Sequence, residues 1–372
     1  MLPRAASMFE FSGNLHVHST FSDGHGTHDQ IAAAALQAGL DFVVVTDHNQ
    51  RPDGLDGYRF GRDQRLLMLI GEEVHDPRRI PEKSHLLVYE ARRAMAEFGK
   101  VPQELIEQTA RHGGLSFLAH PFDCAAPRFK QSDLSWDDWQ VEGYTGLELW
   151  NFMVDYKCRL RSLPEAIFYS YFPSRIARGA NRRALALWDS LLGSGKRVVA
   201  IGNSDAHALP ARWGPLRRTL FPYAWLFRAV NTHVLCEQDL SGEPDRDRAL
   251  LFDAIRLGRC FIGYDLPADT RGFMFSGNSE HGTAVMGDSL TFDLGATLQV
   301  RSPVPGKIRI LRSGSLVREW SAAQHAVLTI SEPGPYRAEV DLPLGSRFRP
   351  WIYSNPIFAQ RISRRVSPAS VI

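Results

Sequence analysis

Short apolar runs alternate with helical stretches from residue 14 to about residue 265, and this alternation strongly constrains the fold. The run DFVVVTDH at 41–48 is too rich in β-branched residues to be half exposed, so we expect a strand buried on both faces. Similar runs recur along this region as RLLMLIGEEV, LSFLAHP and RVVAIGNSDAH. Alternating β and α units imply a parallel sheet, here long enough to close as a barrel.

The segments between these runs carry the usual boundaries of helices. Thr27 is suited to cap a helix that extends to Gly39, since glycine commonly ends helices. A second helix is predicted over 101–114, with Pro102 in its first turn and two glycines at its end. A third is predicted over 245–258.

The pattern of apolar runs and helical stretches changes after about residue 268. Short strand-like runs, among them LTFDLG, KIRILRSG and PYRAEVDL, are separated there by Gly, Pro and Ser. This spacing is typical of a small all-β sandwich. We therefore predict an α/β barrel domain at 1–267, with an insertion at about 125–200, followed by an Ig-like β-sandwich domain at 268–372.

The composition, 44% hydrophobic and 23% charged over 372 residues, is ordinary for a globular protein. A net charge of +2 gives no reason to expect nucleic acid or an anionic membrane as a partner. The chain has no apolar run of about 18 residues, and its N-terminal segment lacks the apolar core of a signal peptide. The four cysteines are scattered without a CxxC pair, which favours reduced thiols in the cytoplasm over disulfides or a thiolate zinc site.

Most of the unusual polar residues fall where a predicted strand ends. They are His16, His18, Asp47, His48, Glu73, His120, Asp205 and His207. His85 is the exception, because it precedes a predicted strand. The C-terminal ends of the strands form the active-site face of a β/α barrel, which would bring these distant residues together. Glu72, whose side chain should point away from Glu73, and His233 are interpreted as structural.

The stretch NLHVHSTFSDGHGTH at 14–28 holds four of the thirteen histidines. Residues i and i+2 of a strand point to the same face, so His16 and His18 are able to bind one group of metal ions. A single HxH pair is a weak indication. Together with a strand-terminal TDH, an isolated Glu, AHP and DxH it predicts a metal site, because buried imidazoles and carboxylates need partners.

The chain resembles the PHP superfamily, the polymerase and histidinol phosphatase family of metal-dependent phosphoesterases. The segments HVHSTFSDG, VVVTDHN, GEE, HLLV, LAHP and NSDAH are similar to that family's motifs and follow the same order between residues 14 and 207. The resemblance implies a distorted TIM-like barrel of seven β/α units, the PHP fold. It also implies a centre of two to three divalent metal ions.

The resemblance further implies which residues hold the metals. The first metal would be held by His16, His18, Glu73 and Asp205. The second would be held by Glu73 as a bridge, with His85 and His120, and the third by Asp23, His48 and His207. Asp23 stands where some members have a histidine, which bears on the affinity of the third site. Nitrogen and oxygen ligands without sulfur suit Zn²⁺, Mn²⁺ or Fe²⁺.

A mechanism follows from this ligand set. We expect a hydroxide that bridges two metals to attack phosphorus in line, because metals lower the pKa of bound water. The metals would hold the non-bridging oxygens and offset the developing charge. Asp205, or a water held by His207, is the expected proton donor to the leaving alkoxide. Arg212 is the expected phosphate contact, since the guanidinium fork matches phosphate oxygens.

The leading interpretation is therefore a cytoplasmic metal-dependent phosphoric ester hydrolase that acts on a small phosphorylated substrate. A monoester and a diester both remain open. A second class is a metal-dependent hydrolase of a carbonyl bond, because a metal hydroxide also attacks carbonyl carbon. A third is a non-catalytic PHP module that metal stabilises, although nine intact ligand positions disfavour it.

Overall fold

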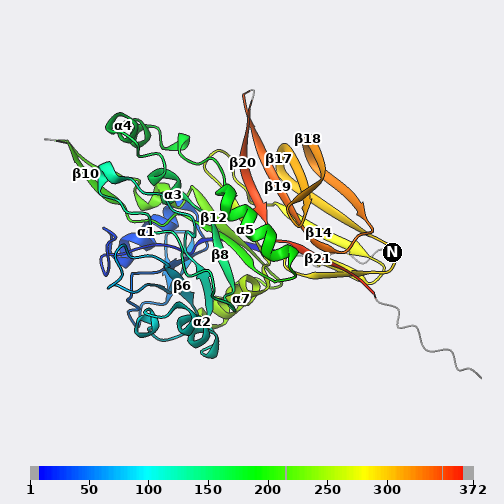
Figure 1. The fold of residues 1–372 in the computed structure, drawn as a ribbon, viewed down its shortest axis with the longest axis horizontal. Coiled ribbons are helices and arrows are strands. Elements are labelled where there is room, and N and C mark those ends of the chain that lie inside the picture. The colour runs from blue at the N-terminus through cyan, green and yellow to red at the C-terminus, as the bar shows by residue number, and fades with distance from the viewer. Residues whose placement is uncertain (1–7, 214–215, 346, 363–372) are drawn as a thin grey trace, which may run out of the picture.

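The computed structural model describes residues 8–213, 216–345 and 347–362, and these fold into a mixed α/β structure (Figure 1). The described residues form one sheet of fourteen strands, one of five strands and a two-stranded hairpin, together with seven α-helices. The predicted α/β class is confirmed. The closed barrel of seven units and the Ig-like sandwich stay predictions.

Two sheets build the N-terminal two thirds of the protein. The first contains β1 (Phe9–Asn14), β2 (Phe42–Val45), β3 (Gly57–Phe60), β4 (Arg65–Ile70), β12 (Val230–Cys236) and β13 (Cys260–Tyr264). The second contains β5 (Glu72–Val74), β6 (Leu86–Tyr89), β7 (Leu115–Leu118), β8 (Gly146–Asn151) and β9 (Val199–Asn203). Isolated bridges join the two sheets where Val17 meets Ala206 and where His48 meets Glu73.

The strands do not all run in one direction, so the predicted parallel sheet is found only in part and both sheets are mixed. β1–β2, β2–β4, β7–β8 and β8–β9 are parallel pairs. β5–β6, β6–β7, β1–β12 and β12–β13 are antiparallel. The apolar runs predicted where the strands lie but not their direction. A buried strand has the same pattern of apolar residues whether it pairs in parallel or antiparallel.

The helices begin and end largely where the sequence indicates. α1 (His28–Ala38) starts after Thr27, whose side chain accepts from the Gln30 N–H in a capping box, and ends at Gly39 in the left-handed conformation. α2 (Pro102–Arg111) has its proline in the first turn. The others are α3 (Phe152–Lys157), α4 (Leu163–Tyr171), α5 (Arg182–Gly193), α6 (Tyr223–Leu226) and α7 (Pro244–Leu257), with 3₁₀ turns η1 (Ala96–Phe98), η2 (Pro127–Phe129) and η3 (Pro173–Arg175). None of the helices in the described ranges is long and apolar enough to cross a membrane.

The C-terminal strands, yellow to red in Figure 1, continue the larger sheet. They are β14 (Met274–Ser279), β15 (Gly282–Val285), β16 (Ser289–Phe292), β17 (Ala296–Arg312), β18 (Ser315–Ile330), β19 (Gly334–Leu344), β20 (Arg347–Ser354) and β21 (Ile357–Arg361). β20 pairs with β13, and the Asn355 amide donates to the carbonyl oxygens of Ala200 and Cys260. The sheet therefore runs past the predicted boundary at 267/268, which falls in the β13–β14 connection.

The cysteines behave differently from the prediction of four reduced thiols. Cys124 and Cys158 form a disulfide, with Cα atoms 5.2 Å apart, while Cys236 and Cys260 are buried and free. The prediction is wrong for the first pair. The two residues lie 34 positions apart, and only the folding of the β7–β8 connection against α3 brings them together.

Candidate metal centre

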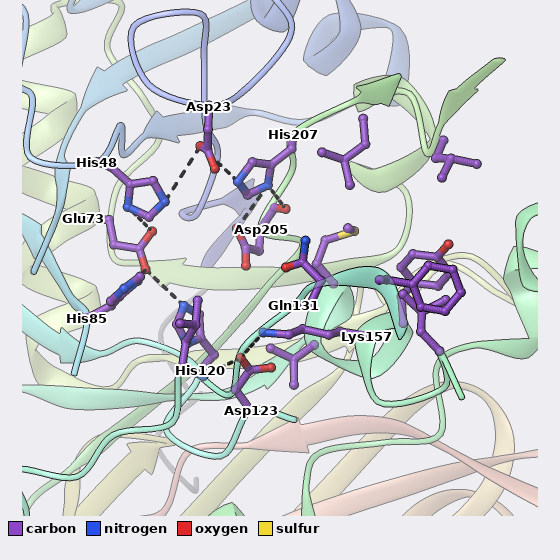
Figure 2. Close-up of a pocket in the computed structure, with 18 residues that line it drawn as sticks. Asp23, His48, Glu73, His85, His120, Asp123, Gln131, Lys157, Asp205 and His207 are labelled. Carbon is purple, nitrogen blue, oxygen red and sulfur yellow. Dashed lines mark hydrogen bonds and ion pairs between the residues drawn. The ribbon is translucent and has the colours of Figure 1, made fainter. Parts of the chain in front are cut away.

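Glu73 lies at the centre of a cluster of histidines at one edge of the five-stranded sheet (Figure 2). Its Oε1 is 2.8 Å from His85 Nδ1 and 3.1 Å from His120 Nε2. Its Oε2 faces three further ring nitrogens, those of His16 at 3.0 Å, His18 at 3.1 Å and His48 at 3.3 Å. Each carboxylate oxygen thus faces a different set of histidines, which is the arrangement a bridging ligand requires.

Two aspartates extend the cluster on either side of His18. Asp205 Oδ1 lies 3.4 Å from His16 Nε2, 3.3 Å from His18 Nε2 and 3.4 Å from His207 Nδ1. Asp23 Oδ1 lies 3.2 Å from His207 Nε2, 3.5 Å from His18 Nδ1 and 3.8 Å from His48 Nε2. The Asp23 side chain is 58% exposed, so the third predicted site lies at the solvent side of the cluster.

All nine predicted ligands therefore come together. Among these nine residues, ligand atoms lie within 4.8 Å of one another in four sets: His18, Asp23, His48 and His207; His16, Glu73 and His120; His16, His18 and Asp205; His48, Glu73 and His85. These sets contain the predicted third site and overlap the first two. That the nine side chains bind metal stays a prediction.

Several ligand atoms are buried without a hydrogen-bond partner among the described residues. They include His18 Nε2, His48 Nδ1 and Asp205 Oδ1. A buried polar atom that makes no hydrogen bond costs about 1–3 kcal/mol, so folds rarely keep several together. A divalent cation coordinated by these nitrogens and oxygens would satisfy them, and the residues present therefore fit a metal centre.

The direction of β6 explains the position of His85. His85 directly precedes β6, which runs antiparallel to both β5 and β7. The start of β6 therefore lies at the same edge as the ends of its neighbours. His85 reaches Glu73 from that edge, although the sequence placed it at the wrong end of a strand.

The backbone around the centre is tightly constrained. His120 and Asp205 have φ angles of +28° and +56°, a region that residues other than glycine rarely adopt. A Cβ on Gly24 would lie 2.1 Å from the carbonyl oxygen of His18, so only glycine fits where the loop folds back on the HxH motif. Local strain of this kind concentrates at functional sites.

Residues 14–107 match the family model of the PHP domain. These residues are therefore similar to the PHP domain. The matched region includes His16, His18, Asp23, His48, Glu73 and His85, and the other predicted ligands lie beyond it. No curated protein matches the chain significantly.

Three solved structures are similar to the chain at low sequence identity. A two-domain protein from Bacteroides vulgatus containing a PHP-like metal-dependent phosphoesterase is 14% identical, with TM-score 0.43, over 96% of this chain and 98% of that one. A protein from Bifidobacterium adolescentis named as a metal-dependent phosphoesterase is 16% identical, with TM-score 0.30, over 55% and 91%. An amidohydrolase from Chromobacterium violaceum is 14% identical, with TM-score 0.26, over 52% and 87%.

Glu148 on β8 forms hydrogen bonds with residues of the cluster, and the sequence analysis did not assign it a role. Its Oε1 accepts from His16 Nδ1 at 3.0 Å and from the Asn203 amide at 3.1 Å. Its Oε2 accepts from the His120 backbone N–H at 3.0 Å and from the Asn151 amide at 2.9 Å. Because a carboxylate only accepts, this contact places a proton on His16 Nδ1 and leaves Nε2, which faces Glu73 and Asp205, as the nitrogen that would bind a metal ion after losing its own proton. A single acid inside the buried run GLELWN was the available indication.

We expect Glu148→Gln to lower metal affinity by about 10- to 100-fold. The NH₂ group of Gln would replace either Oε1 or Oε2 and would face the two N–H donors that this oxygen now accepts from. The hydrogen bond to the His16 ring or to the His120 backbone would then be lost. Titration of the metal-free protein with Mn²⁺ measures the effect. Wild-type affinity in the variant would contradict the role given to Glu148.

Asp47, also at a strand end, holds the loop that carries the HxH motif rather than joining the cluster. Its Oδ1 accepts from the Ser19 backbone N–H at 2.7 Å and from the Ser22 hydroxyl at 2.6 Å. Its Oδ2 accepts from the Ser19 hydroxyl at 2.6 Å. Arg212, the predicted phosphate contact, belongs to the hairpin strand β10 (Leu209–Trp213), and its side chain lies outside the described part of the chain.

The carboxylates and histidines of the centre shift one another's pKa values. Burial lowers the pKa of His18, but the adjacent carboxylates of Asp205 and Glu73 outweigh burial and raise it to about 10. The pKa of His16 is likewise raised, because Asp205, Glu148 and Glu73 outweigh its burial. Burial raises the pKa of Glu73, but the surrounding histidines hold it well below its ordinary value. Protons on the histidines therefore balance the carboxylates in the metal-free protein.

Metal binding should release protons for this reason. A cation must displace the protons of His16 and His18, so we expect affinity to rise with pH until the pH approaches the His18 pKa of about 10. Calorimetric titrations with Mn²⁺ in two buffers of different ionisation enthalpy should report release of about one or two protons per chain. Identical binding heats in both buffers would contradict the expected protonation.

Proposed function

We propose that this protein hydrolyses a phosphate mono- or diester at a metal centre formed by the nine clustered side chains. One observation carries the proposal: five histidines surround both oxygens of the Glu73 carboxylate, and Glu73 with three of them, His48, His85 and His120, lines a cavity of about 340 Å³. A cavity of this size admits a small organic molecule. The substrate class is thus a small phosphorylated compound.

The nine side chains would form three metal sites. His16, His18, Glu73 and Asp205 would hold one ion, Glu73 with His85 and His120 a second, and Asp23 with His48 and His207 a third. Zn²⁺, Mn²⁺ or Fe²⁺ bound there supplies a water nucleophile of lowered pKa and neutralises charge on the phosphoryl oxygens. Because Glu73 is buried and faces ring nitrogens on both oxygens, it would serve as a ligand shared by the first two sites.

The proton for the leaving alkoxide is best supplied near His207. Burial raises the pKa of Asp205, but His16, His207 and His18 outweigh it and hold that pKa well below its ordinary value. Asp205 therefore stays a carboxylate at neutral pH and is a poor proton donor. His207 lines the same cavity, and a water beside it would be the remaining proton donor for the alkoxide.

The test is hydrolysis of p-nitrophenyl phosphate and of bis(p-nitrophenyl) phosphate by protein loaded with Mn²⁺ or Zn²⁺. Asp205→Ala is the variant that should lose activity, and His325→Ala, at an exposed position on β18, is the matched control. Turnover of the monoester or diester identifies the ester class. Failure to hydrolyse either one with metal demonstrably bound would contradict the proposal, and amide and lactone substrates would then test the carbonyl hydrolase.

A further inference from the structure

The cavity beside the metal centre has two unlike halves. One half is formed by the predicted ligands, including Glu73, His120 and His207. The other half is apolar and consists chiefly of Phe129, Leu134, Met153, Val154, Leu160 and Leu220. These residues come from η2, α3 and the hairpin β10–β11 (β11, Leu216–Leu220), together with the segments beside them. A substrate in this cavity would therefore place its phosphoryl group toward the ligands and an apolar group against the opposite wall.

Lys157 is the only lysine or arginine among the described side chains that line this cavity (Figure 2). It lies at the end of α3, and its side chain is only 13% exposed. Its Nζ donates to Oδ2 of Asp123, whose side chain is 2% exposed. An ammonium has three N–H donors, and the described residues provide an acceptor for one of them. The remaining donors are available to a ligand in the cavity.

The Lys157–Asp123 pair is held in place more firmly than a surface ion pair. Asp123 Oδ2 also accepts from the Leu134 backbone N–H at 3.0 Å. The next residue after each partner, Cys124 and Cys158, is joined to the other by the disulfide. The backbones that carry the two charges are thus covalently linked beside the cavity. Such restraint lowers the entropy that a lysine loses when it binds an anion.

We propose that Lys157 binds an anionic oxygen of the substrate, that Asp123 positions Lys157, and that the rest of the substrate is apolar. The inference rests on the proposed function only for the identity of the substrate as a phosphate ester. The anionic oxygen has two sources, the reacting phosphoryl group itself or a second acidic group on the organic part. Both present the same chemistry to an ammonium, and the binding test distinguishes them.

The test measures binding of three compounds that lack a hydrolysable ester bond to the metal-loaded protein by calorimetry. Methylphosphonate, phenylphosphonate and 4-carboxyphenylphosphonate share one phosphoryl-type group, and only the last carries a second acid. Phenylphosphonate should bind about tenfold more tightly than methylphosphonate, because its ring is buried against the apolar half. Equal binding of these two would overturn the apolar part of the proposal.

Lys157→Met should weaken binding by about tenfold or more, while Lys157→Arg, which keeps the charge, should retain most of it. Equal weakening for all three compounds identifies the phosphoryl group as the source. Weakening confined to 4-carboxyphenylphosphonate identifies the second acid. Lys100→Met, at an exposed position, is the matched control and should bind like wild type. Wild-type binding of all three compounds by Lys157→Met at equal metal content would overturn the proposal.

Asp123→Asn tests the positioning role through a double-mutant cycle. Alone, it should weaken binding severalfold, but in the Lys157→Met background it should have no further effect, because there is no ammonium left to position. Additive losses would show that Asp123 acts only through local structure and would overturn its role. The outcome is separate from the proposed function, since phosphonates bind whether or not the wild-type protein hydrolyses esters.

Discussion

Replacing Glu73 by Gln should abolish tight metal binding and reduce ester hydrolysis by about a thousandfold, near the upper range for loss of one charged group in an active site. Gln has the same shape, but it is neutral, and its NH₂ group cannot accept a proton or bind a cation. One of the two histidine sets around the carboxylate would then face a donor instead of an oxygen. The two ions that Glu73 is proposed to bridge would lose their shared ligand.

Glu72 provides a closely matched control, because it is the neighbouring acid on the same strand and is equally buried. Its Oε2 accepts from the Met95 backbone N–H at 2.7 Å, on the opposite face of β5 from Glu73. Burial raises the pKa of Glu72 to about 7, so Gln resembles a form that it already populates at neutral pH. Elemental analysis of both purified variants should show metal loss only in Glu73→Gln. Full metal content in that variant would exclude Glu73 as the bridge.

The sequence allowed the centre to be predicted because metal ligands are costly to bury and therefore conspicuous. His16, His48 and Asp205 each interrupt or follow an apolar run, and a fold that aligns the ends of those runs must bring them together. The helix boundaries were predictable for a similar reason. Thr27 and Gly39 act through their immediate neighbours in the chain, so no tertiary information is needed.

The features that the sequence did not reveal depend on contacts between distant segments. The direction of β6 decides where His85 lies, and the residues of a strand do not by themselves indicate its direction in the sheet. Glu148 and Lys157 acquire their importance from His16 and Asp123, which lie 132 and 34 positions away along the chain. The Cys124–Cys158 disulfide is likewise visible only once the β7–β8 connection has folded against α3. The sequence indicated the nine side chains that cluster, but not the residues that orient them or those that line the rest of the cavity.

His233 was interpreted as a structural histidine, and its surroundings yield the second large prediction. Its side chain, 1% exposed on β12, contacts Glu10 Oε1 at 2.8 Å through Nδ1 and Asp265 Oδ2 at 3.2 Å through Nε2. Burial lowers the pKa of His233, but Asp265 and Glu10 outweigh it and raise that pKa to about 10. His233→Gln would remove the buried cation between two carboxylates. We expect it to lower the free energy of unfolding by about 3–5 kcal/mol at pH 7.

The pH dependence of this difference distinguishes loss of the charge from loss of packing. Because the pKa of His233 in the folded protein, about 10, exceeds the ordinary value of 6.5, its contribution is complete below about pH 6.5 and disappears as the pH rises through about 10. Urea unfolding of wild type and His233→Gln should therefore converge between pH 7 and pH 10.5, apart from a remainder due to packing against the Phe261 ring. His325→Gln, at an exposed position, controls for general effects. A difference that stays constant across this range would mean that His233 is neutral when folded and stabilises the sheet through shape alone.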